Sequence, residues 1–253
     1  RKIQNGVESN MSNNGFAVDR DPLFNENNLI WMDLEMTGLE PQINRILEMA
    51  AVITDPQLNV IAEGPVVAIH QDASILSNMD SWNTATHTRS GLVNRCLESK
   101  VTEDEAAQIF IDFFSKYVPA GKSPLCGNSI GQDRRFMARW TPRLEQFFHY
   151  RNLDVSSFKE CVKRWAPEVM KKYQKTSRHE ALSDIYDSVE ELRFYRQEIM
   201  KIWFFLAPKN TKASEIPRLS RYLEAIKTSS VLCWAGESET DIGRFVRFVF
   251  KNV

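Results

Sequence analysis

Apolar and polar side chains alternate through residues 28–36, a pattern that predicts a β-strand with two unlike faces. One face is apolar, and the other carries Trp31, Asp33 and Glu35. Two like charges side by side in a partly dry site need a compensating cation, because an unpaired buried carboxylate is costly or takes up a proton. The strand therefore predicts a divalent metal site. The alternative is an edge strand whose polar face meets water.

Two further strands are expected at residues 46–54 and 60–69. The segment 55–59 between them is rich in turn-forming residues, so the two strands predict an antiparallel hairpin. Glu48 lies within the first of these strands and is a candidate for a further acidic group of the site, although a lone acidic residue in a strand more often faces solvent.

A long helix is predicted to begin at residues 102–105, a Thr-x-x-Glu capping box, and to end before Pro119 and Gly121. Short helical pieces are expected before it, around residues 80–87. The apolar residues expected on the buried face of the long helix are Ala106, Ile109, Phe110, Phe113 and Tyr117.

The rest of the main pattern alternates strand and helix and ends in a second long helix, which carries Asp184 and begins near the capping box 177–180. This order predicts an α/β domain with a mixed sheet flanked by helices. The elements expected before that helix are a strand at 123–129, a helix that carries Asp133, a strand at 152–155 and a helix at 157–165.

The two ends of the chain differ from this pattern. Residues 1–27 are polar and rich in asparagine, and we expect a flexible arm before the main domain at 28–200. The extension 201–253 has an apolar cluster at 203–206 and an aromatic end at 245–250. These side chains are expected to bury against the main domain, a second subunit or another protein, and the role of the extension stays open.

Composition narrows the class of ligand. The formal net charge is −1, so the chain lacks the excess of Lys and Arg with which proteins grip long nucleic acids. A nucleic-acid ligand would then be very short, or bound through metal and base stacking. The four cysteines form no C-x-x-C pair, which argues against a zinc site and for reduced, intracellular thiols. No apolar run approaches the ~20 residues of a membrane span.

Four separated motifs occur in the order of a known family. They are Leu29-Ile30-Trp31-Met32-Asp33-Leu34-Glu35-Met36-Thr37-Gly38-Leu39, Gly127-Asn128-Ser129-Ile130-Gly131-Gln132-Asp133, His149-Tyr150-Arg151-Asn152-Leu153-Asp154-Val155-Ser156 and His179-Glu180-Ala181-Leu182-Ser183-Asp184-Ile185. From about Asn28 to Ile199 the chain resembles the oligoribonucleases, which belong to the DEDDh group of 3′-to-5′ exonucleases. The resemblance implies an RNase H-like mixed sheet flanked by helices, in agreement with the order of elements.

The resemblance implies that His179 is the general base, and that two Mg²⁺ or Mn²⁺ ions are held by Asp33, Glu35, Asp133 and Asp184. An imidazole whose pKa is near neutrality suits the task of taking a proton from the attacking water. Five helical residues turn ~140° beyond a full circle, so His179 and Asp184 do not share an ideal helix face. Because His179 is expected in the first turn, it could still swing over the same pocket. Ser183 departs from the family, in which many members carry a second aspartate there.

Substrate contacts are also implied by the resemblance. Leu39 is implied as an apolar wedge between two bases, and Trp82 and His87 as residues that line and close the pocket. Ser129 and Gln132 resemble polar contacts near the 5′ end. The alternative for Leu39 and Trp82 is core packing.

In this family Tyr150, Arg151 and Ser156 belong to the neighbouring subunit and cap the other's site. The resemblance therefore implies a homodimer with composite sites. Groups that hold a 5′ phosphate would wall off the channel, which explains a preference for short substrates.

The expected function is a metal-dependent 3′-to-5′ exoribonuclease that degrades dinucleotides and other very short oligoribonucleotides to nucleoside 5′-monophosphates. One alternative is a DEDDh exonuclease for longer DNA or RNA. Another is an oligoribonuclease-like subunit with a structural role, docked in a larger assembly through residues 201–253. The chain begins at Arg1 and has an extra tail, which favours a mitochondrial over a cytoplasmic location.

Overall fold

The computed structural model describes residues 20–173 and 180–206 of the chain. Within these residues, the strands form one mixed five-stranded sheet with the order β3-β2-β1-β4-β5. The strands are β1 (Leu29–Met36), β2 (Ile46–Thr54), β3 (Val60–Ala68), β4 (Leu125–Gly127) and β5 (Asn152–Asp154). β2 runs antiparallel to β1, and β4 runs parallel to it. The predicted mixed sheet and the predicted β2–β3 hairpin are confirmed.

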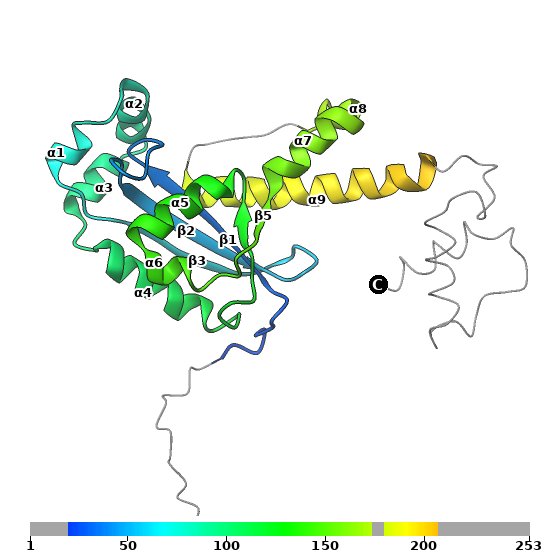
Figure 1. Ribbon diagram of the computed structural model, residues 1–253, viewed down its shortest axis with the longest axis horizontal. Helices are drawn as coiled ribbons and strands as arrows, with labels where there is room; N and C mark the ends of the chain where they lie inside the picture. Colours follow the sequence, from blue (N-terminus) through cyan, green and yellow to red (C-terminus); the bar gives the residue numbers. More distant parts are fainter. Residues whose placement is uncertain (1–19, 174–179, 207–253) are drawn as a thin grey trace, which may run out of the picture. The chain divides into compact units, whose positions relative to one another are not determined.

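The described residues also form the helices that are labelled in Figure 1. They are α1 (Ala73–Leu76), α2 (Ser81–Arg89), α3 (Leu92–Glu98), α4 (Glu103–Phe114), α5 (Ile130–Trp140), α6 (Pro142–Glu145), α7 (Val155–Trp165), α8 (Pro167–Met170) and α9 (Ala181–Leu206). The chain divides into two units after Met200. The features described below belong to the first unit. No helix of the described residues is long and apolar enough to cross a membrane.

β1 lies at the centre of the sheet, with β2 on one side and β4 on the other. The alternative of an edge strand is therefore wrong. The expected position of one strand residue also needs correction. Glu48 was expected to face solvent, but it is only 3% exposed because β2 is an interior strand and Arg95 of α3 pairs with the carboxylate.

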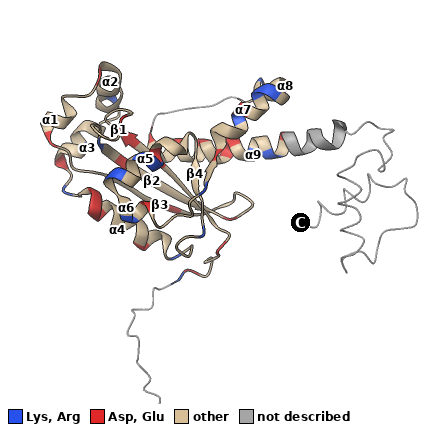
Figure 2. Ribbon diagram, in the orientation of Figure 1, with Lys and Arg blue, Asp and Glu red and all other residues tan. Residues whose placement is uncertain are grey.

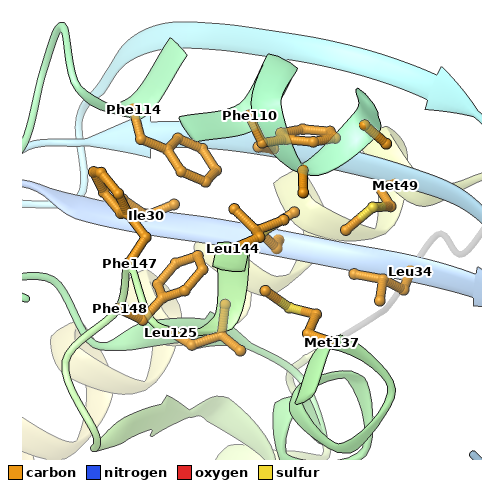
Figure 3. Close-up of a cluster of buried hydrophobic side chains, with 14 of the residues drawn as sticks. Ile30, Leu34, Met49, Phe110, Phe114, Leu125, Met137, Leu144, Phe147 and Phe148 are labelled. Carbon is orange, nitrogen blue, oxygen red and sulfur yellow. The ribbon is translucent and has the colours of Figure 1, made fainter. Parts of the chain in front are cut away.

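The hydrophobic core lies between one face of the sheet and helices α4, α5 and α6 (Figure 3). The capping box of α4 is confirmed, since Thr102 Oγ1 accepts from the Glu105 N–H and the Glu105 carboxylate accepts from the Thr102 N–H. Phe110 of α4 is fully buried, whereas Ile109 is 38% exposed and not inward as expected. Successive helix residues are about 100° apart, and the buried stripe continues from Phe110 to Phe114.

The opposite face of the sheet carries α9. Tyr186 of α9 donates a hydrogen bond to Glu63 of β3 at 2.6 Å, and Arg193 donates to the Leu58 carbonyl. On the inner side of α9, the apolar side chains of Ile185, Val189, Leu192 and Tyr195 are buried. The start predicted at 177–180 falls largely outside the described residues.

The predicted arm at 1–27 and extension at 201–253 lie mostly outside the described residues. Where the arm is described, the backbone N–H groups of Asp21 and Asn25 donate to the carbonyls of Lys116 and Tyr117, just after α4. This hydrogen bonding ties the start of the main domain to the end of α4.

Candidate active site and metal centre

Three carboxylates meet on the face of the sheet that carries α9. Asp33 and Glu35 of β1 and Asp184 of α9 each offer an oxygen, and these oxygens lie within 4.8 Å of one another. Strand alternation puts Asp33 and Glu35 on the same face, and the first turn of α9 brings Asp184 to them. The acidic positions on β1 and α9 are drawn red in Figure 2.

Asp133 approaches the same strand from α5. Its Oδ1 accepts a hydrogen bond from the Leu34 N–H at 3.0 Å, between the two acidic positions of β1. Among the described residues, the group of carboxylates whose oxygens lie within 4.8 Å of one another does not include Asp133. Burial raises the pKa of Asp133 to about 7, against the lowering effect of its backbone hydrogen bonds.

Glu35 is the carboxyl most affected by this crowding. Its pKa rises to about 8, first because of burial and then because of the negative charges of Asp184, Glu48 and Asp133, while Arg95 opposes the rise. Carboxylate oxygens are the ligands that Mg²⁺ and Mn²⁺ prefer. The donor set therefore fits a divalent cation, whose charge would compensate the cluster.

His87 of α2 lies beside Glu35. It is buried, its Nε2 is 3.1 Å from the Met36 carbonyl oxygen, and its Nδ1 is 3.9 Å from Glu35 Oε2. Burial lowers the pKa of His87, which favours the neutral ring. A neutral imidazole that donates from Nε2 to the Met36 carbonyl has an unprotonated Nδ1 toward Glu35. His179, the expected general base, lies outside the described residues.

Leu39 and Trp82 are both exposed, by 69% and 62%. The alternative of core packing is therefore wrong for both. Gln132 Nε2 of α5 donates a hydrogen bond to the Leu39 carbonyl, and Gln132 Oε1 accepts one from Arg135 at 2.7 Å. Gln132 thus ties the β1–β2 loop to α5.

Ser129 and Ser156 lie side by side, and we refer to them as the hydroxyl pair. Their Oγ atoms are 3.0 Å apart, and the Ser129 N–H donates to Ser156 Oγ at 2.9 Å. Asp154 holds both residues, since its Oδ1 accepts from the Ser129 N–H and the Ser156 N–H. Ser156, expected in the neighbouring subunit's site, contacts Ser129 and Asn128 of its own chain.

Tyr150 lies on the surface between α6 and β5 and is 73% exposed. Its ring packs against His149, with centroids 4.4 Å apart, and the Arg151 guanidinium lies 5.3 Å from its centroid. The three side chains form an exposed aromatic and basic projection, away from the buried core of the chain.

Sequence reasoning missed several residues around the site. Arg95, Asp154, Asn128 and Glu191 all contact groups of the site or their immediate partners. Asp154 offered a local signal, since an Asp before a helix is a typical N-cap and its side chain accepts from the Ser156 N–H. The others depend on contacts between distant parts of the chain.

Solved structures share the fold of this chain. One is the zinc-bound form of the E. coli ExoI–ssDNA complex, with a TM-score of 0.52 and 17% identity, which covers 74% of this chain and 44% of that chain. Another is Exonuclease I from Methylocaldum szegediense, with a TM-score of 0.52 and 18% identity, covering 82% of this chain and 48% of that one. The chain spans less than half the length of these structures and has the fold of an exonuclease.

Residues 30–192 match the exonuclease family RNase_T. The oligoribonuclease of Bordetella pertussis is 56% identical, covering 70% of this chain and 98% of that protein. The oligoribonuclease of Vibrio cholerae is 56% identical, covering 71% of this chain and 99% of that protein. The oligoribonuclease of Legionella pneumophila strain Corby is 58% identical, covering 70% of this chain and 95% of that protein. The chain belongs to the oligoribonuclease family, as its four motifs predicted.

Proposed function

We propose that this protein is a 3′-to-5′ exoribonuclease that degrades very short oligoribonucleotides to nucleoside 5′-monophosphates. The carboxylates of Asp33, Glu35 and Asp184, which meet within 4.8 Å, carry the proposal. A cluster of this kind is suited to phosphodiester hydrolysis, and the chain is 56% identical to oligoribonucleases along nearly their whole length.

Asp33, Glu35 and Asp184 would hold the cations, with Asp133 completing the set. Two Mg²⁺ or Mn²⁺ ions, when bound, stabilise the attacking and leaving oxygens of an in-line displacement. Asp133 is tied to the β1 backbone by its bond to the Leu34 N–H, so its carboxyl stays against the strand that carries the first two acids. This bond supports a role for Asp133 in positioning the site as well as in ligation.

His179 is the proposed general base. It precedes Asp184 by five positions in the sequence, and α9 begins two residues after it. A neutral imidazole there would accept the proton of the attacking water. His87 is less suited to this task, because it is buried and its Nε2 is committed to the Met36 carbonyl.

Substrate binding is assigned to groups around the carboxylates. The exposed Leu39 would separate two bases, and the exposed Trp82 and the buried His87 would line and close the pocket. Ser129, Gln132 and Ser156 would contact the 5′ end. The net charge of −1 supports a substrate with few phosphates, because counter-charges for a long strand are missing.

We further propose a homodimer in which Tyr150 and Arg151 complete the neighbouring site. The 73% exposure of Tyr150 and its stacking with Arg151 support a surface that a second subunit covers. The exonuclease domain is proposed as residues 28–200, followed by an extension at 201–253 whose role stays open. A mitochondrial location is retained as a prediction that cell fractionation checks.

A dinucleotide hydrolysis assay tests the function. The purified protein is expected to release nucleoside 5′-monophosphates from a diribonucleotide with Mg²⁺, and chelation is expected to stop the release. Asp133→Ala and His179→Ala are expected to abolish it while the circular dichroism spectrum stays unchanged. Full activity in either variant rejects the assignment.

A length series separates this function from an exonuclease for longer strands. Rates are compared on a dinucleotide and on a long single strand of RNA or DNA at equal 3′-end concentration. Faster turnover of the dinucleotide is expected. Faster turnover of the long strand would assign the protein to the other substrate class.

A further inference from the structure

Asn128 lies between the hydroxyl pair and helix α9. Its Oδ1 accepts a hydrogen bond from Ser156 Oγ at 3.1 Å. Its Nδ2 donates to Ser188 Oγ at 2.9 Å and to Glu191 Oε2 at 3.1 Å. The two sides of the amide therefore face different elements of the fold, α7 through Ser156 and α9 through Ser188 and Glu191.

Glu191 fixes which way this amide faces. A carboxylate only accepts hydrogen bonds, so it can bond the amide Nδ2 but not the amide Oδ1. Glu191 is fully buried, and its Oε1 lies 2.8 Å from Lys159 Nζ and accepts from the Tyr195 hydroxyl at 2.6 Å. The ammonium of Lys159 compensates the buried charge, so the acceptor is kept in place.

The orientation of the amide decides how the hydroxyl pair is arranged. The Ser156 hydrogen goes to Asn128 Oδ1, so Ser156 Oγ is left to accept from the Ser129 N–H at 2.9 Å. If the amide were reversed, its NH₂ group would face Ser156 and the hydroxyl would have to turn. The direction of hydrogen bonding at the pair is thus set from α9.

The same network reaches the carboxylate cluster. Ser188 accepts from Asn128 and donates its own hydrogen to the backbone carbonyl of Asp184 at 2.8 Å. The turn of α9 that carries Asp184 is in this way connected to the hydroxyl pair. A rigid connection of this kind preserves the spacing between the two parts of the site.

We propose that Glu191 is a positioning residue, which acts through Asn128 to hold the hydroxyl pair in the orientation that receives the 5′ end of the substrate. The proposal rests on the proposed function, in which the hydroxyl pair contacts a short oligoribonucleotide near that end. Glu191 itself does not touch the substrate. Its effect is therefore expected in binding of the 5′ end rather than in the chemical step.

Glu191→Gln tests the proposal with little change of shape. Steady-state kinetics are measured with Mg²⁺ on a diribonucleotide that carries a 5′ phosphate and on the same dinucleotide with a 5′ hydroxyl. The KM for the 5′-phosphorylated substrate is expected to rise roughly tenfold, as for one lost hydrogen bond to a charged group. The kcat and the KM for the 5′-hydroxyl substrate are expected to stay within about twofold of the unmodified protein.

Glu190→Gln is the matched control, because it makes the same chemical change one position earlier on the same helix. The Glu190 side chain is 59% exposed and pairs with Arg193 outside the network. Unchanged KM values are expected for both substrates. A KM rise in Glu190→Gln equal to that in Glu191→Gln would overturn the proposal.

A merely structural role of Glu191 gives a different result. In that case Glu191→Gln would lower the melting temperature and leave the ratio of the KM values for the two substrates unchanged. This result would overturn the proposal. If Glu191→Gln does not fold, Asn128→Ala replaces it, since Glu191 then keeps Lys159 and Tyr195 as partners. If the ratio of the KM values for the 5′-phosphorylated and 5′-hydroxyl substrates in Asn128→Ala equals that of the unmodified protein, the proposal is also overturned. Unmodified protein that hydrolyses neither dinucleotide would instead refute the proposed function, and this proposal with it.

Discussion

Glu35 of β1 and Glu48 of β2 lie directly opposite each other in the antiparallel register. Like charges in this arrangement destabilise a sheet. Glu48 has an ion-pair partner in Arg95, whereas the pKa of Glu35 rises to about 8 under burial and the nearby charges. Without a bound cation, the Glu35 carboxyl therefore tends to hold a proton, and a cation has to displace that proton to bind.

The thermal stability of cation-free protein is expected to fall as the pH rises from about 4.5 to about 8. A carboxyl whose pKa is raised from 4.5 to about 8 by folding stabilises the fold fully below 4.5, and this contribution is lost as the pH passes 8. Asp133 acts in the same direction, because burial raises its pKa to about 7. Calorimetric melting in the presence of chelator measures the dependence.

Glu35→Gln is the control for this pH dependence, since it removes one titrating group and should flatten the curve. Mg²⁺ is expected to raise the melting temperature more near pH 8 than near pH 5, because a carboxylate must lose its proton to bind the cation. A melting temperature that rises with pH in chelator, in the same way for both proteins, would contradict the expected electrostatics of the cluster.

Arg95→Met is expected to lower the free energy of unfolding by about 1–3 kcal/mol, because a buried carboxylate loses its charged donor. The Glu48 side chain is 4% exposed and that of Arg95 is 45% exposed, so Glu48 is the group that is left without compensation. Urea unfolding followed by circular dichroism measures the change.

Two further variants test whether the loss in Arg95→Met comes from an unpaired buried charge. Glu48→Gln in the Arg95→Met background should recover most of the loss, since it removes the unpaired charge. Arg164→Met breaks an ion pair with Glu160 in which both side chains are at least half exposed, and a change below about 0.5 kcal/mol is expected. Equal losses for the two arginines would argue against a buried-charge effect.

Trp82→Ala is expected to raise the KM for a dinucleotide roughly 5- to 150-fold, because stacking of a base on an aromatic ring contributes ~1–3 kcal/mol. Trp82 is 62% exposed, so its removal leaves no cavity in the core. Trp165→Ala is the matched control, since Trp165 of α7 is 77% exposed and has no assigned contact with substrate. If both variants raise the KM alike, or neither does, the stacking role of Trp82 is rejected.

The sequence predicted the centre of the fold well because strand periodicity is a local property. Alternation along β1 placed Asp33 and Glu35 on the same face, and both are in the carboxylate cluster. The position of Asp184 depended on how α9 crosses the sheet, which no local pattern encodes. Its meeting with the β1 acids followed only from the resemblance to a family.

The wrong expectation for Glu48 and the missed contacts also arise from tertiary packing. Glu48 was expected to face solvent because a lone acidic residue in a strand usually does, but α3 covers that part of β2 and supplies Arg95. The partners Asn128 and Glu191 are 63 positions apart. Their pairing depends on tertiary packing, so no spacing rule applied to the sequence could predict it.

Subunit mixing tests whether the site is shared between two chains. Tyr150 is 73% exposed, and its ring contacts His149 and Arg151 rather than the core of its own chain. Tyr150→Ala is therefore expected to fold normally and to lose turnover of a dinucleotide, while Asp33→Ala loses it through the carboxylate cluster. Melting curves of the separate variants check that both are folded before they are mixed.

In a mixed dimer, one site combines an intact Asp33 from the Tyr150→Ala chain with an intact Tyr150 from the Asp33→Ala chain. After equal mixing and random exchange, about half of the dimers are mixed and each has one complete site, so about a quarter of the wild-type activity should return. Two controls should show much less dinucleotide hydrolysis. One is the same mixture assayed before the subunits have exchanged. The other is an exchanged mixture of Asp33→Ala and Asp184→Ala, in which both variants damage the carboxylate cluster. Equal activity in the two mixtures after exchange has been verified by mass spectrometry would mean that each chain builds its site alone.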